Sequence, residues 1–141
     1  MNKPTLIPEL KVTDFKLSLD FYTKLLGFHI LYDRLEEDFA MLSIHGAQLM
    51  IEGIVGTGRT WTVGAMERPF GRGMNLQIEI KSIDDLYQKL KRNHYPIFQE
   101  IETKWYRIEN QEIGNKQFLV QDPDGYLLRF FEDIGKRTKA S

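Results

Sequence analysis

Four charged residues lie in segments whose neighbours are mostly aliphatic: Glu9, Glu52, Glu79 and Arg129. Side chains alternate between the two faces of a strand, so these residues are expected opposite the apolar face. Carboxylates on that face would attract a cationic ligand, with Arg129 opposing them. Alternatively, Glu52 or Glu79 forms an ion pair with Arg129, since a buried carboxylate needs a partner.

Aromatic residues form a second group with binding chemistry. Trp105 and Tyr106 lie in a polar stretch that reads as the connection between two strands, and Trp61 lies in a glycine-rich segment near Phe70. Such rings can stack on a flat ligand, or they can cover loop backbone or a dimer contact. Both interpretations remain open from the sequence.

Several other chemistries find no support. The chain has no cysteine, which excludes disulfides, thiolate nucleophiles and cysteine-based zinc sites. His29, His45 and His94 are expected to be surface or capping residues. Residues 53–60 nearly match a phosphate-binding loop, but the β-like stretch 60–64 follows instead of a helix, which argues against nucleotide binding. No Gly-x-Ser-x-Gly elbow predicts a hydrolase.

Charge and hydropathy restrict the partners. Nineteen basic and 20 acidic residues give a net charge of -1, which favours neither nucleic acid nor an anionic membrane. The chain has no apolar run of about 18 residues, and its N-terminal residues lack the apolar core of a signal peptide. We therefore expect a cytoplasmic protein whose partner is a small molecule.

The elements that must position these residues follow one order twice. In the first half, residues 9–12 are expected to be the end of a strand, and a helix follows that is capped by Asp14 and ended by Gly27. Strands are expected next at 28–32, 39–44 and 48–51. In the second half, alternation over 75–80 predicts a strand and 84–93 a helix, followed by strands at 96–102, 117–121 and 126–132.

This order predicts an α+β fold made of two βαβββ modules. The modules are expected at 5–52 and 75–132 within a single domain, 1–134, joined by the loop 53–74 and followed by a frayed basic tail at 135–141. Nine aliphatic or aromatic strand residues should form the faces that the helices cover: Leu10, Val12, Leu49, Ile51, Leu76, Ile78, Ile80, Leu128 and Phe130.

Two segments resemble the vicinal oxygen chelate superfamily, which includes glyoxalase I, extradiol dioxygenases and bleomycin-resistance proteins. Residues 10–28, LKVTDFKLSLDFYTKLLGF, are similar to its opening strand and helix, and residues 118–130, FLVQDPDGYLLRF, to its closing hairpin. The resemblance implies that each module curls its sheet into a cup, with the helix outside and ligands inside. It also implies a homodimer.

The resemblance locates the four positions at which metal-dependent members carry His or Glu. Here these positions hold Ile7, Met50, Asn75 and Arg129. A permanent guanidinium repels a cation, so we expect no metal site and no cofactor. A shift of the alignment would bring Glu52 or Glu79 to a ligand position, which leaves a metal-dependent enzyme as the alternative.

The resemblance is strongest to bleomycin-resistance proteins, in which aromatic loop residues stack on the flat part of the drug. The sequence therefore predicts a metal-independent homodimer that sequesters a small, flat compound able to carry positive charge, such as a bleomycin-type antibiotic. The alternatives are a metal-dependent glyoxalase- or dioxygenase-like enzyme and an interaction module without a small ligand. The candidate ligand-binding residues are Trp61, Trp105, Tyr106, Phe39, Glu52, Asn75, Gln77 and Arg129.

Overall fold

The computed structural model describes residues 3–55 and 61–138. These residues form two compact units, the first made of 3–55, 61–72 and 122–126 and the second of 73–121 and 127–138. Each unit contains one four-stranded mixed sheet, and the predicted α+β class is confirmed. Two stretches lie outside the described residues: 56–60, the last part of the segment that is similar to a phosphate-binding loop, and 139–141, the end of the tail.

The sheet of the first unit has the order β1-β4-β3-β2, in which β1 and β4 run parallel and the other neighbours antiparallel. Its elements are β1 (Glu9–Val12), α1 (Phe15–Asp20), the π-helical turn η1 (Phe21–Leu25), β2 (His29–Arg34), the 3₁₀ turn η2 (Leu35–Glu37), β3 (Phe39–Ile44) and β4 (Ala47–Gly53).

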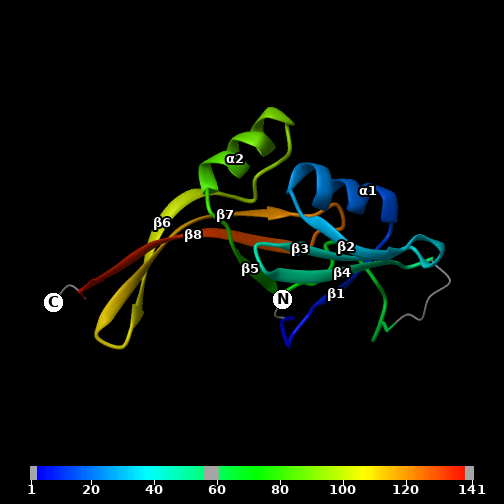
Figure 1. The fold of residues 1–141 in the computed structure, drawn as a ribbon, viewed down its shortest axis with the longest axis horizontal. Coiled ribbons are helices and arrows are strands. Elements are labelled where there is room, and N and C mark those ends of the chain that lie inside the picture. The colour runs from blue at the N-terminus through cyan, green and yellow to red at the C-terminus, as the bar shows by residue number, and fades with distance from the viewer. Residues whose placement is uncertain (1–2, 56–60, 139–141) are drawn as a thin grey trace. The chain divides into compact units, whose positions relative to one another are not determined.

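Helix α1 begins where the sequence predicts, but it ends at Asp20, and the rest of the predicted helix is the π-helical turn η1. The Asp14 side chain accepts a hydrogen bond from the Leu17 amide at 3.1 Å, which satisfies one of the free donors at the helix start. The turn η1 continues the helix, and Gly27 then adopts a φ of 90°, which favours glycine. Leu10, Val12, Leu49 and Ile51 are buried as predicted, on the sheet face over which α1 lies (Figure 1).

The sheet of the second unit repeats this arrangement with the order β5-β8-β7-β6, and only β5 and β8 are parallel. Helix α2 lies over one face of it (Figure 1). The helix is capped by Ser82, and its buried Ile83, Leu86 and Leu90 form the apolar stripe. The elements are β5 (Asn75–Glu79), α2 (Ile83–Arg92), β6 (Gln99–Ile108), β7 (Gln111–Gln121) and β8 (Leu127–Thr138).

The last three strands are longer than the sequence indicated. Strand β6 continues through Trp105 and Tyr106, so the prediction that these residues lie in a connection was wrong. Strand β8 continues to Thr138 by pairing with the start of β7, so residues 135–138 are not frayed. Their polar composition hid these extensions, because a strand paired on an exposed part of a sheet needs backbone hydrogen bonds and few apolar side chains.

The turn 122–126 joins β7 to β8 and belongs to the first unit. Its buried carboxylates bind residues of that unit: Asp122 accepts from the Tyr22 hydroxyl at 2.7 Å, and Asp124 accepts from the Thr13 amide at 2.9 Å and the Thr13 hydroxyl at 2.6 Å. The guanidinium of Arg68 lies 3.0 Å from Asp124. The turn is therefore an interior part of the first unit.

Burial raises the pKa of Asp122 to about 6, although the Tyr22 hydroxyl and the Tyr126 and Asp124 amides favour its charged form. Folding therefore strengthens proton binding at Asp122. The stability that this proton contributes is complete below the ordinary Asp value of 3.8 and is lost as the pH rises through about 6.

The variant Asp122→Asn should remove this pH dependence. An asparagine keeps the oxygen that accepts the two backbone amides, and it cannot ionise. Lowering the pH from 7 to 4.5 should stabilise the wild type relative to the variant by about 1–3 kcal/mol in urea unfolding. A constant difference between the two proteins over this range would contradict the assignment.

Candidate ligand-binding site

Side chains of the second unit's sheet divide into an apolar and a polar face. The buried residues Ile78, Phe118, Val120, Leu128 and Phe130 lie on the face that α2 covers, where the Tyr87 ring of α2 contacts Phe118 with ring centroids 5.7 Å apart. Strand alternation and register place a mixed set on the other face, where Leu119, Leu127 and Phe131 lie among polar residues. We call it the polar face after its polar residues: Asn75, Gln77, Glu79, Glu102, Tyr106, Gln117 and Arg129.

Arg129 lies on β8, which is flanked by β5 and β7 in this sheet. It lies directly opposite Gln77 of the neighbouring strand β5, and its Nη2 atom donates a hydrogen bond to the Gln77 Oε1 atom. Asn75 lies two residues before Gln77 and is exposed on the same face. The structure therefore brings three predicted site residues together.

Gln117 and Tyr106 form a second cluster on the polar face. The Gln117 Nε2 atom donates to the Tyr106 hydroxyl at 2.7 Å and to Glu102 at 3.2 Å. Gln117 is 3% exposed, and its amide is held between Tyr106, which is half-buried, and Glu102, which is exposed. Sequence reasoning missed Gln117, although two-residue alternation back from the 122–125 turn would have placed it on this face.

Trp105 does not share a face with Tyr106, because consecutive strand residues point to opposite sides. Its ring lies over Gly114, where an added Cβ would come within 2.7 Å of both the ring and Ile134. The Arg137 guanidinium lies 4.1 Å from the ring centroid. The Trp105 ring, which the sequence analysis assigned to ligand binding, is thus used in contacts with Gly114 and Arg137 of the neighbouring chain segments.

In the first unit, Phe39 and Glu52 pair directly across β3 and β4. Glu52 is 6% exposed and forms an ion pair with Lys11 of β1, which is 5% exposed, rather than with the Arg129 that the sequence suggested. The Arg34 guanidinium lies 4.0 Å from the centroid of the Phe39 ring. Glu52 is therefore a buried carboxylate whose charge is balanced by Lys11. The sequence analysis did not predict Lys11 as its partner.

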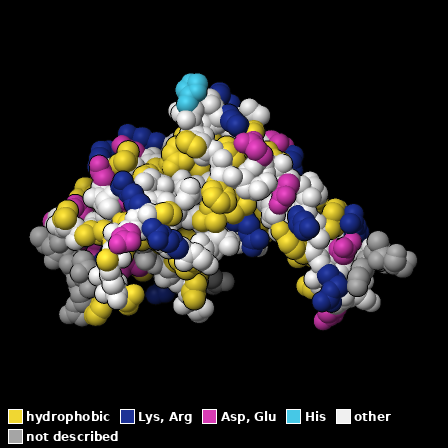
Figure 2. Space-filling model, turned by 180° about the vertical axis from the view of Figure 1, so that it is seen from behind, with side chains coloured by type: hydrophobic (Ala, Val, Ile, Leu, Met, Phe, Trp, Pro, Cys, Tyr) yellow, Lys and Arg dark blue, Asp and Glu magenta, His cyan; other side chains and the backbone are white. Residues whose placement is uncertain are grey.

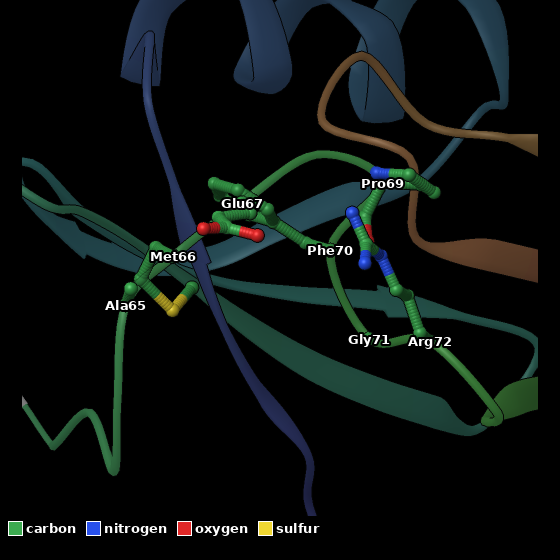
Figure 3. Close-up of a pocket in the computed structure, with 7 residues that line it drawn as sticks. All are labelled: Ala65, Met66, Glu67, Pro69, Phe70, Gly71 and Arg72. Carbon is green, nitrogen blue, oxygen red and sulfur yellow. The ribbon is translucent and has the colours of Figure 1, made fainter.

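Trp61 is 69% exposed in the segment between the two modules. Phe70, by contrast, is buried and packs edge-on against Tyr126 with ring centroids 5.8 Å apart. The same segment forms a pocket of about 230 Å³ lined by residues 65–67 and 69–72 (Figure 3). This volume is below the range of roughly 300–1,000 Å³ typical of ligand pockets, and Arg72 there donates to the backbone oxygens of Arg68 and Pro69.

The two positions of the second unit to which the resemblance assigns metal ligands, Asn75 and Arg129, do not fit a divalent metal ion. Asn75 offers one weak amide ligand, and Arg129 presents only donors, one of them already bound to Gln77. Within residues 3–55 and 61–138, no three His, Cys, Asp or Glu side chains are grouped so that they could hold a metal. His29, His45 and His94 are all exposed.

Charges of both signs lie close together on the face of the molecule shown in Figure 2. No helix in the described part of the chain is long and apolar enough to cross a membrane. The polar face carries charges of both signs: the exposed carboxylates include Glu79, Glu102 and Asp133, and the cations include Arg129 and Lys104.

Comparison with known proteins identifies the family. Residues 8–130 match the model of the Glyoxalase/Bleomycin resistance protein/Dioxygenase superfamily, and the chain belongs to this superfamily. Proteins named bleomycin resistance protein from Geobacillus stearothermophilus and Staphylococcus aureus are 29% identical to it over 136 residues, covering 91% of this chain and 96% of theirs. The resemblance drawn from the two motifs is thereby confirmed.

Solved structures share the fold at lower identity. TioX from Micromonospora sp. ML1 has a TM-score of 0.68 at 21% identity, covering 92% of this chain and 98% of its own. A lactoylglutathione lyase from Agrobacterium tumefaciens has a TM-score of 0.59 at 14% identity, covering 93% of this chain and 96% of its own. An enzyme thus shares the fold, so function has to be argued from the site.

The ion pair of Lys11 and Glu52 is expected to behave as a structural unit. Lys11→Met should lower the free energy of unfolding by about 3 kcal/mol, because the Glu52 carboxylate stays buried without its cation. Glu52→Leu should cost less, because Lys11 keeps a second partner, the Glu9 Oε1 atom at 3.7 Å from its Nζ atom. The double variant should lie within about 1 kcal/mol of the wild type in urea unfolding. Additive losses in the double variant would show that the pair is not what holds these side chains.

Proposed function

We propose that the protein is a metal-independent binding protein that sequesters a small, flat compound able to carry positive charge, of the bleomycin type. The observation that supports this most is the polar face of the second sheet, where Gln77, Arg129, Gln117 and Tyr106 form a hydrogen-bonding surface without a ligand set for a metal. The similarity to proteins named bleomycin resistance protein supports the same class of function.

Each group on the polar face has a separate part in the proposal. Arg129 and Gln77 bind polar acceptors of the ligand, and the Tyr106 ring provides a flat apolar surface. Exposed Glu79 and Glu102 attract its cationic groups. In this proposal Trp61, which is exposed, adds a stacking surface, whereas Trp105 supports the strands from the opposite face.

The proposed state of the protein is a cytoplasmic homodimer. The resemblance to bleomycin-resistance proteins implies a groove shared by two subunits, and such an assembly would enclose a ligand that one open sheet face leaves exposed to water. Sedimentation velocity at ligand-binding concentrations tests this assembly.

Isothermal titration with bleomycin in the presence of a chelator tests the proposed function. The wild type should bind the metal-free drug in the micromolar range, and Arg129→Ala should weaken binding by about tenfold through loss of a charged hydrogen-bond donor. Arg92→Ala, at the exposed end of α2, makes the same substitution away from the polar face and should leave binding unchanged.

Two results would contradict this function. One is the absence of any heat of binding up to about 1 mM drug, since a sequestering protein needs a far lower dissociation constant. The other is stoichiometric retention of nickel, zinc, manganese or iron by protein purified without chelator, accompanied by turnover of a glyoxalase or dioxygenase substrate.

A further inference from the structure

Two polar atoms of the polar face have no hydrogen-bond partner within the described residues. They are the Oε1 atom of Gln117, which can only accept, and the Nε atom of Arg129, which can only donate. A buried polar atom that stays unpaired lowers stability, and most buried polar atoms in folded proteins have a partner, so these two atoms need an explanation.

The hydrogen bonds that the rest of each side chain makes show why these two atoms lack a partner. The amide of Gln117 is oriented by the Glu102 carboxylate, which accepts from Nε2 and leaves Oε1 on the other side. The Arg129 Nη2 atom donates to Gln77, and the Nε–H of the same guanidinium is buried without an acceptor. Gln117 Oε1 thus lacks a donor, and Arg129 Nε lacks an acceptor.

The two residues are diagonal neighbours on the same face. Arg129 lies directly opposite Leu119, and Gln117 is two residues from Leu119 along β7. Diagonal positions of this kind are about 7–8 Å apart at their Cα atoms, within reach of two long side chains. A single small group can therefore contact both atoms.

We propose that the polar face binds a neutral carboxamide group of its ligand, whose N–H donates to Gln117 Oε1 and whose carbonyl oxygen accepts from Arg129 Nε. This inference rests on the proposed ligand-binding function and specifies the group that is recognised. A carboxamide carries its donor and acceptor on one carbon, and with two hydrogen bonds it spans protein atoms up to about 8 Å apart.

Other simple groups satisfy one of the two atoms and oppose the other. A carboxylate would pair with Arg129, but it would place a negative oxygen against Gln117 Oε1 and beside Glu102. An ammonium group would suit Gln117 and Glu102, but Arg129 would repel it. An apolar group would leave both atoms unpaired.

Access to Gln117 lies beside Glu102. Gln117 is 3% exposed, whereas Glu102 is exposed and holds the Gln117 amide through one hydrogen bond of 3.2 Å. In this proposal the Glu102 side chain moves aside, while the Tyr106 hydroxyl keeps its hydrogen bond from Gln117 Nε2 and so holds the amide in place. The entering carboxamide then lies over β7 and β8 on the polar face.

The test compares nicotinamide with nicotinate, two flat probes that differ only in the amide and the acid. In NMR titrations of the full chain up to about 50 mM, a range suited to fragments of this size, nicotinamide should saturably shift the Gln117 side-chain amide and Arg129 Nε–H signals. Its dissociation constant should be at least about fivefold lower than that of nicotinate, as one hydrogen bond predicts.

Three variants make the comparison specific. Gln117→Met should remove the preference for the amide, whereas Gln88→Met, the same substitution at an exposed position of α2, should retain it. Arg129→Lys should also lose the preference while still binding nicotinate through its charge. Because Arg129→Lys leaves Gln117 in place, it remains informative if Gln117→Met fails to fold.

The proposal is overturned if the two probes bind equally, if neither moves these signals, or if Gln117→Met keeps the preference. Its failure is distinct from failure of the proposed function. Bleomycin binding without an amide preference overturns the carboxamide site alone. An amide preference without bleomycin binding overturns the antibiotic-binding function alone.

Discussion

The alternation of side chains across the β5–β8 sheet is the constraint on which the account depends. Helix α2 covers one face, so every second strand residue there has to be apolar, and Ile78, Phe118 and Phe130 meet this requirement. The residues between them face the other way and are free of that requirement. The same register that buries Phe130 therefore places Arg129 between Gln77 and Leu119, which creates the polar face.

Local patterns in the sequence predicted the parts of the fold that depend on apolar burial. The cap at Asp14, the φ of Gly27 and the buried faces of β1 and β4 follow from spacing and side-chain type alone. The ends of β6 and β8 could not be predicted in this way. Exposed strands are held by backbone hydrogen bonds, which leave no pattern of side-chain types in the sequence. Reading Trp105 and Tyr106 as a connection then hid their opposite orientation.

The sequence likewise predicted only one part of the candidate site. Alternation placed Asn75, Gln77 and Arg129 on one face, whereas the partners of buried charges depend on register between distant strands. Lys11 and Glu52 are opposite each other only because β1 pairs with β4 in parallel. The superfamily's fold is shared by an enzyme and by resistance proteins, so these side-chain contacts, rather than the fold, separate the possible functions.

Mapping the metal-free drug onto the chain by backbone amide chemical shifts, in the presence of chelator, tests the central claim most directly. The account predicts shifts that saturate and that centre on Gln77, Tyr106, Gln117 and Arg129, with little change in α2. Shifts confined to the segment 65–72 or to α2, or shifts that require an added divalent ion, would contradict it.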